Sequence, residues 1–549
     1  MSESTPRRRL LLHATLVVGC TVVLALYLGW PSLVRADRFH ENWRQVPQWL
    51  SPDKQYFQDD DLLLRYSEFG TTPFGNALYK TLARTGHDIL WGKVMTIVVF
   101  ALGALSCFLA AHAMSGLIAG WVSVVLFLFF PSMYEHFVGG FMAAFSWPLL
   151  GFAVLLIYRQ RWWWAVPLVS LSALVYPMVG IHIGMMYLID TIYHDVRTGR
   201  LRDRAFWRTK LLPLVLAALA LAAILGAKYF EDHGFGELAR RADMQDRIEF
   251  TKEGRYRILP TTALWDRIER QWEDSFHFPL LLIGVFFLGR GAFRLPRGVY
   301  TLLVASLIMY TVADYFVMQL YLPSRYIRRS LPLFTCLVGG IWWARIVADS
   351  LRSSAAKLDL QQMMQRLKPL TVATLLLVGL GLREFGDELE PGEHTRTFKR
   401  HELYQAIREL PGRPMIAAWP RLASELPLMT GRTVLVNKEQ AHPWWLGLWD
   451  EVVERTQEFW RAYYTDDPDE LRRVIDRYGI DYWVVEPRYF RRGRRSMGHF
   501  EPLESWVEEL AQSSPRPLLS RVPPDLRLYA DKRHFLVASS DLLQWLEER

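Results

Sequence analysis

The chain has 549 residues, 51% of them apolar and 14% aromatic, with 64 basic and 56 acidic residues and a formal net charge of +8. Arginine and lysine in the loops that orient membrane helices account for this excess, so it requires no nucleic-acid partner. The three cysteines, Cys20, Cys107 and Cys336, all fall in apolar segments. This placement excludes a disulfide framework in the C-terminal part, and no CxxC or zinc-ligand spacing occurs.

Long apolar runs are confined to residues 1–383, whereas residues 384–549 have the composition of a soluble domain. The sequence therefore predicts a polytopic α-helical membrane protein with a C-terminal extracytoplasmic α/β domain, divided at that boundary. The long outer loops are 31–89 and 228–276. We expect eleven membrane spans, several of them shorter than the roughly 20 residues of a full crossing. They are 10–30, 90–112, 115–131, 140–157, 163–176, 178–193, 210–227, 277–290, 299–318, 330–348 and 369–383.

Charge sets the expected orientation. The segment 194–210 is rich in arginine and is predicted to stay on the cytoplasmic side. This requires 163–176 and 178–193 to be separate helices that meet at Tyr176-Pro177, because proline disfavours helix in the residue before it. The first span is then a retained signal anchor with a cytoplasmic N-terminus. The C-terminal domain is expected on the outer face of the plasma (inner) membrane.

The first outer loop carries three consecutive carboxylates, Asp59, Asp60 and Asp61. Such a run is usually a solvated turn. Repulsion between neighbours can instead raise the pKa of one carboxylate and make it a base, or the run can bind a divalent cation. Asp61 opens a leucine run and is expected to cap a helix, which leaves Asp59 or Asp60 as the expected base or metal ligand.

A second group of candidates departs from the rule that positively charged loops stay in the cytoplasm. Arg325, Arg328 and Arg329 lie in a loop predicted to be outside, where positive charge is rare. The planar fork of arginine suits a phosphate or pyrophosphate, so these residues are candidates for a substrate-phosphate site. Contact with lipid headgroups is the alternative. Asp314, late in the preceding span, is either functional or a partner for an arginine of the following loop.

Three further groups of candidates are weaker. Glu135 and His136 form a short outer loop that is either a second acidic or metal site or simply solvated. The lone His182 is expected to be a packed residue. No GxGxxG, P-loop, HExxH or GxSxG motif occurs. Loops after strands often bind ligands, and tryptophans there can stack on a sugar or anchor the domain to the membrane interface. Candidates for such acceptor or sugar contacts are Asn437, Lys438, His442, Trp444 and Trp445.

The C-terminal part alternates between helical and strand patterns. This alternation predicts a small α/β domain with a largely parallel sheet. The expected helices are 398–409, a short one after the first strand, 446–463 and 468–478. The expected strands are 415–418, 433–436, 481–485, 526–529 and 535–538.

The order of these parts resembles the GT-C class of membrane glycosyltransferases, which includes protein mannosyltransferases, aminoarabinose transferases and oligosaccharyltransferases. The resemblance covers nearly the whole chain. It rests on an acidic pair in the first outer loop, here within Asp59–Asp61, on the short helix pair 163–193, and on the strands at Arg432–Val434 and Tyr482–Val485. Many members have Asp followed by Glu, whereas this chain has only Asp, so the position of the pair within the triplet is open.

The resemblance implies transfer of a sugar from a polyprenyl phosphate or pyrophosphate donor to an extracytoplasmic glycan, lipid or protein acceptor. It also allows a divalent cation such as Mg or Mn. A transporter or flippase of lipid-linked sugars is one alternative, but such proteins favour internal repeats and midplane sites, and neither pattern occurs here. A non-catalytic cell-envelope assembly protein is the other. The sequence leaves the sugar and the acceptor open.

Overall fold

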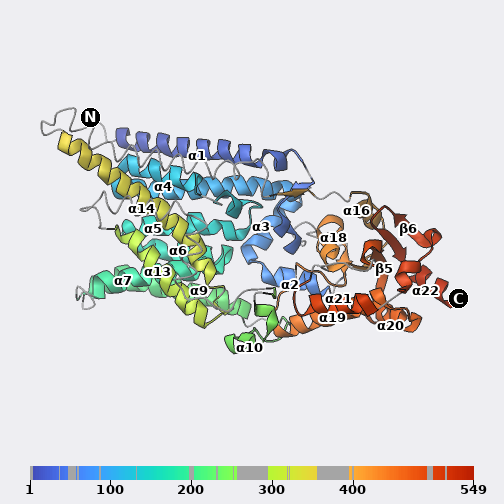
Figure 1. Cartoon of the computed structure of the whole chain (residues 1–549). Coiled ribbons are helices and arrows are strands. Elements are labelled where there is room, and N and C mark those ends of the chain that lie inside the picture. Colours follow the sequence, from blue (N-terminus) through green and yellow to red (C-terminus); the bar gives the residue numbers. More distant parts are fainter. Residues whose placement is uncertain are drawn as a thin grey trace.

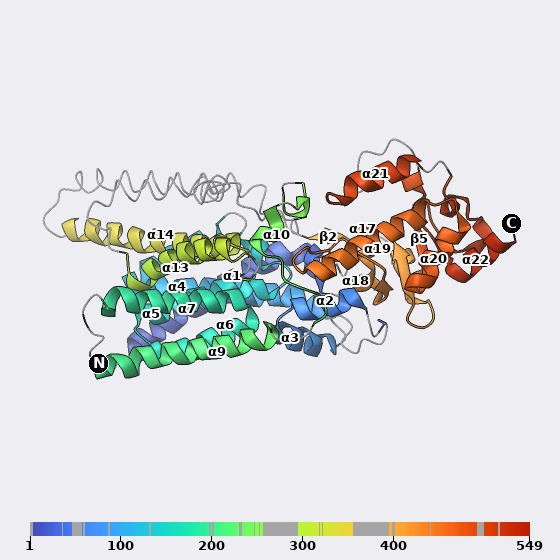
Figure 2. The ribbon, with the colours of Figure 1, turned by 90° about the horizontal axis from the view of Figure 1, so that it is seen from below.

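A helical bundle and a C-terminal domain built on a sheet form the two halves of the molecule, and the N-terminus lies at the end of the bundle away from that domain (Figures 1 and 2). The computed structural model describes residues 4–35, 37–46, 57–58, 61–85, 88–130, 133–196, 199, 203–229, 233–245, 247–251, 253–255, 295–317, 319–320, 322–354, 395–397, 401–439, 441–490, 499–513 and 516–548.

Within these residues, four helices are long and apolar enough to cross a membrane: Arg8–Leu33, Ile89–Leu128, Arg204–Gly226 and Arg297–Tyr315. The predicted spans 277–290 and 369–383 lie outside the described residues, as does the predicted domain boundary, so eleven spans remain a prediction. The main helices of the bundle are α1 (Ser4–Leu33), α4 (Asp88–Leu128), α5 (Ser146–Tyr158), α6 (Ala165–Val175), α7 (Pro177–Thr191), α8 (Arg204–Phe206), α9 (Leu212–Tyr229), α13 (Arg297–Tyr315) and α14 (Ser324–Ser354).

Two predicted breaks in the apolar helices are confirmed. Helix α4 is interrupted at Ser115 and Gly116, where the glycine has a positive φ of 85° that only glycine adopts readily. The rings of Phe100 and Phe127 then stack at 5.7 Å, so the two halves of α4 lie side by side as a hairpin. The second break is at Tyr176, whose extended backbone separates α6 from α7.

The outer-loop elements include α2 (Leu62–Gly70) and α3 (Pro73–Ala83). Helix α3 begins at Thr72-Pro73, with the Thr72 hydroxyl accepting a hydrogen bond from the Gly75 amide at 3.2 Å. Shorter elements are β1 (Arg38–Phe39), η1 (Glu41–Gln45), η3 (Tyr134–Phe137), α10 (Arg241–Gln245) and η9 (Ile248–Phe250).

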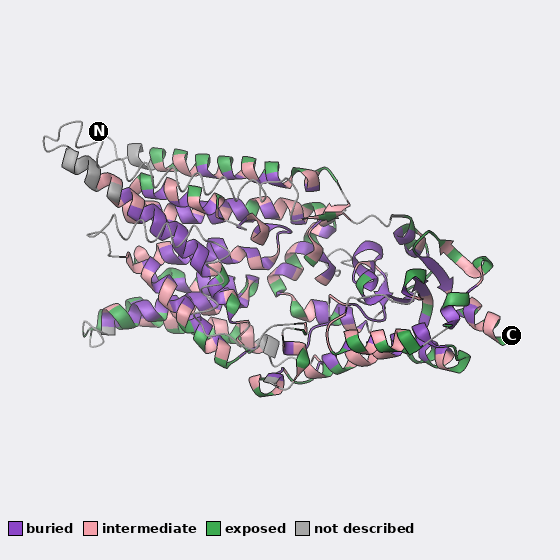
Figure 3. Cartoon of the chain, in the orientation of Figure 1, coloured by how far each residue is buried: buried purple, intermediate pink, exposed green. Residues whose placement is uncertain are grey.

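The C-terminal domain contains a five-stranded sheet in the order β4-β3-β5-β7-β6. Its strands are β3 (Met415–Ala418), β4 (Thr433–Val434), β5 (Ile480–Val485), β6 (Arg527–Ala530) and β7 (Phe535–Ala538). Its helices are α16 (His401–Arg408), α17 (Pro420–Ala423), α18 (Leu426–Thr430), α19 (Leu446–Tyr464), α20 (Pro468–Tyr478), α21 (Leu503–Ser513) and α22 (Ser539–Glu547), and they cover a core that Figure 3 shows as buried.

The expectation of a largely parallel sheet is wrong for half of the strand pairs. Strand β3 is parallel to β4 and β5, but β7 is antiparallel to both β5 and β6. Strands β6 and β7 are joined by only the short link 531–534, which permits an antiparallel hairpin and is too short for a parallel crossover.

The outer loops hold the C-terminal domain against the bundle. Strand β1 pairs with β2 (Arg396–Thr397), which leads into the domain. In the second outer loop, the carbonyls of Phe235 and Glu237 accept hydrogen bonds from the amides of Leu448 and Leu446, at 3.0 and 2.9 Å. Gly236 lies so close to the Gly447 backbone that a side chain would collide there. The two outer loops therefore lie between the helical bundle and the C-terminal domain and bond to the latter.

Candidate functional site

The structure describes only one residue of the acidic triplet, Asp61. Asp59 and Asp60 lie outside the described residues. Asp61 caps α2, where its Oδ1 accepts a hydrogen bond from the Leu64 amide at 2.9 Å, so its predicted capping role is confirmed. Burial raises the pKa of the Asp61 carboxyl, against the opposite effect of hydrogen bonds from Leu64 and the Thr433 hydroxyl. Gln58 also donates its amide to that hydroxyl, at 2.9 Å.

Two of the three predicted arginines, Arg325 and Arg329, converge on Tyr176 at the break between α6 and α7. We call these two residues the arginine pair. Arg325, in the first turn of α14, donates from Nη1 to the Tyr176 hydroxyl at 3.0 Å. Arg329, one turn further, places its guanidinium over the Tyr176 ring at 4.5 Å. Arg328 is exposed, and as the residue just before Arg329 it is turned by about 100° around the helix axis from it. Sequence reasoning missed Tyr176 as a functional residue, although its position before a helix-breaking proline was the available signal.

Arg329 is held by neutral groups. Its Nη1 donates to the Ser146 hydroxyl at 2.7 Å and to the Ala143 carbonyl at 2.9 Å. These dipoles and the tyrosine ring orient the guanidinium without cancelling its charge. With Arg325 and Arg328 nearby, the first turns of α14 concentrate positive charge at the edge of the bundle that faces the C-terminal domain. Such a group suits an anion.

A loop of the C-terminal domain lies above this charge. The buried ring of His442 stacks on Trp444 at 4.8 Å and contacts the Tyr66 ring of α2 at 5.7 Å. Burial, together with Arg255 and Arg325, holds the pKa of His442 well below its usual value. This histidine is therefore neutral. Its neighbour Trp444 packs against the same apolar cluster as Leu322, just before α14, so the loop lies near Arg325.

The other candidates of this loop mainly fasten the domain to the outer loops. Trp445 packs against the rings of Phe69 and His233, at 5.5 and 4.2 Å. Asn437 is buried, and the Lys438 ammonium lies 4.3 Å from the centre of the Phe500 ring. Burial, then Arg255 and Arg421, lower the pKa of Lys438. Trp445 thus anchors the domain to the outer loops, and the predicted sugar contact of this loop stays a prediction.

Glu439 was missed as an organising residue. Its carboxylate meets Arg44 of the first outer loop at 2.8 Å and Arg255 of the second at 3.6 Å. Gln45 adds a hydrogen bond at 3.4 Å. One carboxylate of the C-terminal domain thus joins both outer loops, and no local sequence pattern predicts a contact between residues so far apart.

Glu135 and His136 lie in the turn η3, and Asp314 lies in the last turn of α13. The His136 ring stacks on Trp147 at 5.9 Å, and Glu135 is partly buried in the same turn, η3. Among the described residues, no group of three or more His, Cys, Asp or Glu could hold a metal ion. Asp314 pairs with Arg241 of the preceding outer loop at 3.3 Å, so the expected partner in the following loop is wrong.

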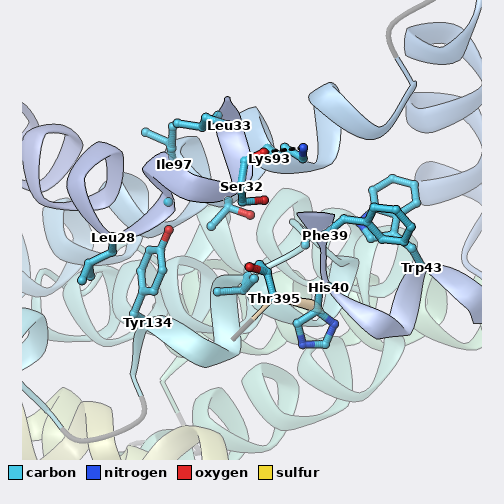
Figure 4. A pocket seen from close by; sticks show the side chains of 14 residues that line it. Leu28, Ser32, Leu33, Phe39, His40, Trp43, Lys93, Ile97, Tyr134 and Thr395 are labelled. Atoms are coloured by element: carbon cyan, nitrogen blue, oxygen red, sulfur yellow. Dashed lines mark hydrogen bonds between the residues drawn. The ribbon is translucent and has the colours of Figure 1, made fainter. Parts of the chain in front are cut away.

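Figure 4 shows a small hollow elsewhere, where α1, α4 and the first outer loop meet. Lys93 donates there to the carbonyls of Ser32 and Arg35, at 2.5 and 2.9 Å. The Ser32 hydroxyl in turn donates to the Arg38 carbonyl at 2.9 Å. The space is about 30 Å³, and its polar groups are bonded within the protein, so this hollow serves as a joint between elements.

Comparison with known structures finds solved proteins with a similar fold. ArnT from Cupriavidus metallidurans, bound to undecaprenyl phosphate, matches with a TM-score of 0.54 over 95% of this chain and 97% of its own, at 13% identity. The fold is that of the GT-C glycosyltransferases. AglB from Archaeoglobus fulgidus, in complex with an inhibitory peptide and a dolichol-phosphate, matches with a TM-score of 0.51 over 86% of this chain and 69% of its own, at 11% identity.

A second structure of the Archaeoglobus fulgidus oligosaccharyltransferase, with Zn and sulfate, has a TM-score of 0.51 over 86% of this chain and 68% of its own, at 12% identity. No protein-family profile matches the sequence, and no curated protein matches it significantly. The likeness lies in the GT-C fold, over both the bundle and the C-terminal domain, and it confirms the resemblance inferred from the order of parts.

Proposed function

We propose that this protein is a glycosyltransferase that moves a sugar from a polyprenyl phosphate or pyrophosphate to an acceptor outside the cytoplasm. The observation that carries the proposal is the convergence of Arg325 and Arg329 on Tyr176, within a GT-C fold and beneath a loop of the C-terminal domain. The structural neighbours bind undecaprenyl phosphate or dolichol-phosphate, which are lipids of the class this proposal assigns to the donor.

The arginine pair supplies the charge that the reaction needs. When the sugar departs, negative charge grows on the phosphate of the lipid, and guanidinium groups fixed in advance stabilise it at no cost of reorganisation. Ser146, Ala143 and Tyr176 hold Arg329 in place with neutral contacts, so its charge stays available for the phosphate. In this arrangement Arg325 and Arg329 bind the donor, whereas Arg328 is exposed and contributes long-range attraction.

Asp59 or Asp60 is the proposed base, which accepts the proton of the acceptor hydroxyl. Asp61 is the least favoured of the three for that task, because its carboxylate already caps α2 and contacts Thr433. A divalent cation would be held by Asp59 and Asp60, which lie outside the described residues, and among the described residues no group of three metal-ligating side chains occurs. We therefore assign no step to a metal.

Substitution by asparagine separates the chemistry of the triplet from its folding, since asparagine keeps shape and hydrogen bonding. In membranes supplied with a polyprenyl-linked sugar, Asp59→Asn or Asp60→Asn should lose transfer by roughly 100-fold or more, as expected for removal of a general base. Asp61→Asn is the matched control and should lose far less. Near-normal transfer in both of the first two variants would remove the triplet from the active site.

The proposal also fixes the orientation. The charged segment around Arg204 lies at the end of the bundle that carries the N-terminus, away from the C-terminal domain (Figures 1 and 2). Positive segments stay in the cytoplasm, so we propose that the C-terminal domain lies on the opposite, outer side of the membrane. Reporter fusions at Arg204 and at Arg549 should report opposite sides of the membrane, and a common side would contradict this orientation.

A further inference from the structure

A second pocket lies within the C-terminal domain, away from the arginine pair. It forms where the parallel strands β3 and β5 end, between Trp419, which follows β3, and Glu486, which follows β5. The chain leaves these strand ends through different elements, α17 and the short helix η10 (Pro487–Phe490), and leaves a space between them. Ligands commonly bind at the carboxyl ends of parallel strands.

The pocket is large enough for a ring-sized ligand. Its volume is about 230 Å³, which is more than tenfold the roughly 10–15 Å³ that one water molecule requires. The Trp419 and Tyr489 rings at its wall are almost parallel, at 11°. Trp460 packs edge-on against Trp419 at 4.3 Å and fixes the wall from behind. The site is therefore preformed.

Glu486 is the central polar group of the pocket. Its side chain is 1% exposed, and its backbone amide and carbonyl are both bonded to the Tyr463 hydroxyl, which fixes its direction. Carboxylate atom Oε2 forms an ion pair with Arg488 at 2.6 Å, yet it has no well-aligned hydrogen bond among the described residues. The buried His534 ring also faces this atom, with its Nε2 at 3.7 Å, so the charge of Glu486 is compensated within the protein and the carboxylate is fixed in place.

The charges of the lining select the ligand. Arg421 and Arg488 are balanced by Glu425 and Glu486, so the pocket has no net charge to favour a phosphate or an ammonium group. Neighbouring hydroxyl groups match it, because each can donate to a carboxylate and accept from a guanidinium. Trp419 and Tyr489 are nearly fully buried and stack on each other, so they brace the pocket, and its charged lining suits the hydroxyl groups of a neutral carbohydrate.

The pocket is joined to the loop above the arginine pair. The Pro420 carbonyl of α17 accepts a hydrogen bond from the Lys438 amide at 3.1 Å. The Ser424 hydroxyl, just after α17, accepts from the amides of Lys438 and Glu439, at 3.1 and 3.2 Å. Helix α17 therefore has the pocket on one side and the loop that begins at Asn437 on the other.

We infer that this pocket binds a sugar unit of a glycan, held by Glu486, Arg421 and Arg488. Under the proposed function the lipid donor is held by Arg325 and Arg329, so the sugar unit in this separate pocket belongs to the acceptor, which is then a glycan. That second statement rests on the proposed function, whereas carbohydrate binding by the pocket does not depend on it.

The test uses the full-length protein in lipid nanodiscs on an array of neutral and uronic-acid-containing oligosaccharides. The wild-type protein should retain neutral oligosaccharides, and Glu486→Gln should weaken retention at least tenfold. Arg421→Ala, at an exposed position that folding tolerates, should do the same. Glu547→Gln, at an exposed glutamate of α22, is the matched control and should bind as the wild type does.

Three results would overturn the inference: no oligosaccharide retained, only acidic ones retained, or equal retention by Arg421→Ala and the wild type. Binding of undecaprenyl phosphate, measured in parallel, separates this test from that of the proposed function. Arg421→Ala should bind that lipid normally. If Arg329→Ala also binds it normally, the proposed donor site is wrong. The oligosaccharide array still tests whether the pocket binds a carbohydrate.

Discussion

Basic residues at the two ends of the helical bundle have opposite surroundings. At the end that carries the N-terminus, Arg297 donates from Nε and Nη2 to the two carboxylate oxygens of the fully buried Asp190. Lys210 donates to Asp195 there at 2.6 Å. At the end that faces the C-terminal domain, Arg329 is held by a hydroxyl, a carbonyl and an aromatic ring. The first pairs are neutral as units, whereas the second site keeps its charge.

This difference separates structure from function more clearly than the residue type does. A buried ion pair satisfies both partners, and removal of either one leaves an uncompensated charge. An arginine oriented by dipoles is fixed in place but still attracts an anion, as a phosphate site requires. We therefore expect substitutions at the first end to harm folding, and substitutions at the second end to harm activity.

The largest effect on folding is expected at Arg297. Its replacement by alanine leaves the buried Asp190 carboxylate without its bidentate partner. Loss of one member of a buried pair costs about 3–5 kcal/mol. Thermal unfolding of purified protein in detergent should show a much lower midpoint for Arg297→Ala than for Arg329→Ala. Equal midpoints for these two variants would contradict the claim that the ion pairs near the N-terminus support folding more than Arg329 does.

The largest effect on activity outside the acidic triplet is expected at Arg329. Removal of a charged hydrogen-bonding group from a bound phosphate costs about 1.5–3 kcal/mol, or roughly 10- to 150-fold in use of the donor. Transfer measured at subsaturating donor should fall by that factor in Arg329→Ala, with the protein still folded. Lysine should rescue poorly, because it lacks the planar fork. Full activity in the triple alanine variant of Arg325, Arg328 and Arg329 would contradict the donor site.

A smaller effect, on stability alone, is expected at Asp61. Asparagine caps helices as well as aspartate does, so Asp61→Asn should change stability by only a few tenths of a kcal/mol. Alanine cannot accept from the Leu64 amide and should cost about 0.5–2 kcal/mol. Unfolding of the two variants checks this order. An asparagine variant that is less stable than the alanine variant would show that the charge of Asp61, and not its cap, matters.

Local signals predicted the fold where local physics decides it. Pro177 marks the break between α6 and α7, the expected spans 90–112 and 115–131 separate within a few residues of the observed break at Ser115 and Gly116, and the strands at 415–418 and 535–538 agree with the structure at both ends. The antiparallel side of the sheet was missed, because pairing depends on the link between β6 and β7 rather than on the composition of either strand.

The candidate site was predicted less completely, because its contacts join distant parts of the chain. The sequence singled out the arginines of α14 by their unusual place in an outer loop. It gave no means of knowing that Arg325 and Arg329 meet Tyr176, about 150 residues earlier, while Arg328 does not. Nor could it show that Glu439 joins Arg44 to Arg255, since a shared carboxylate leaves no periodic pattern.

The most direct test of the account is the affinity of the purified protein for undecaprenyl phosphate. It is to be measured for the wild type, for Arg329→Ala, and for Arg328→Ala as the matched control on the same turn of α14. We expect the wild type and Arg328→Ala to bind within a few fold of one another, and Arg329→Ala to bind roughly tenfold or more weakly, the loss expected for a charge-assisted contact. Equal binding by all three proteins would show that the charge held at Tyr176 does not serve the donor phosphate.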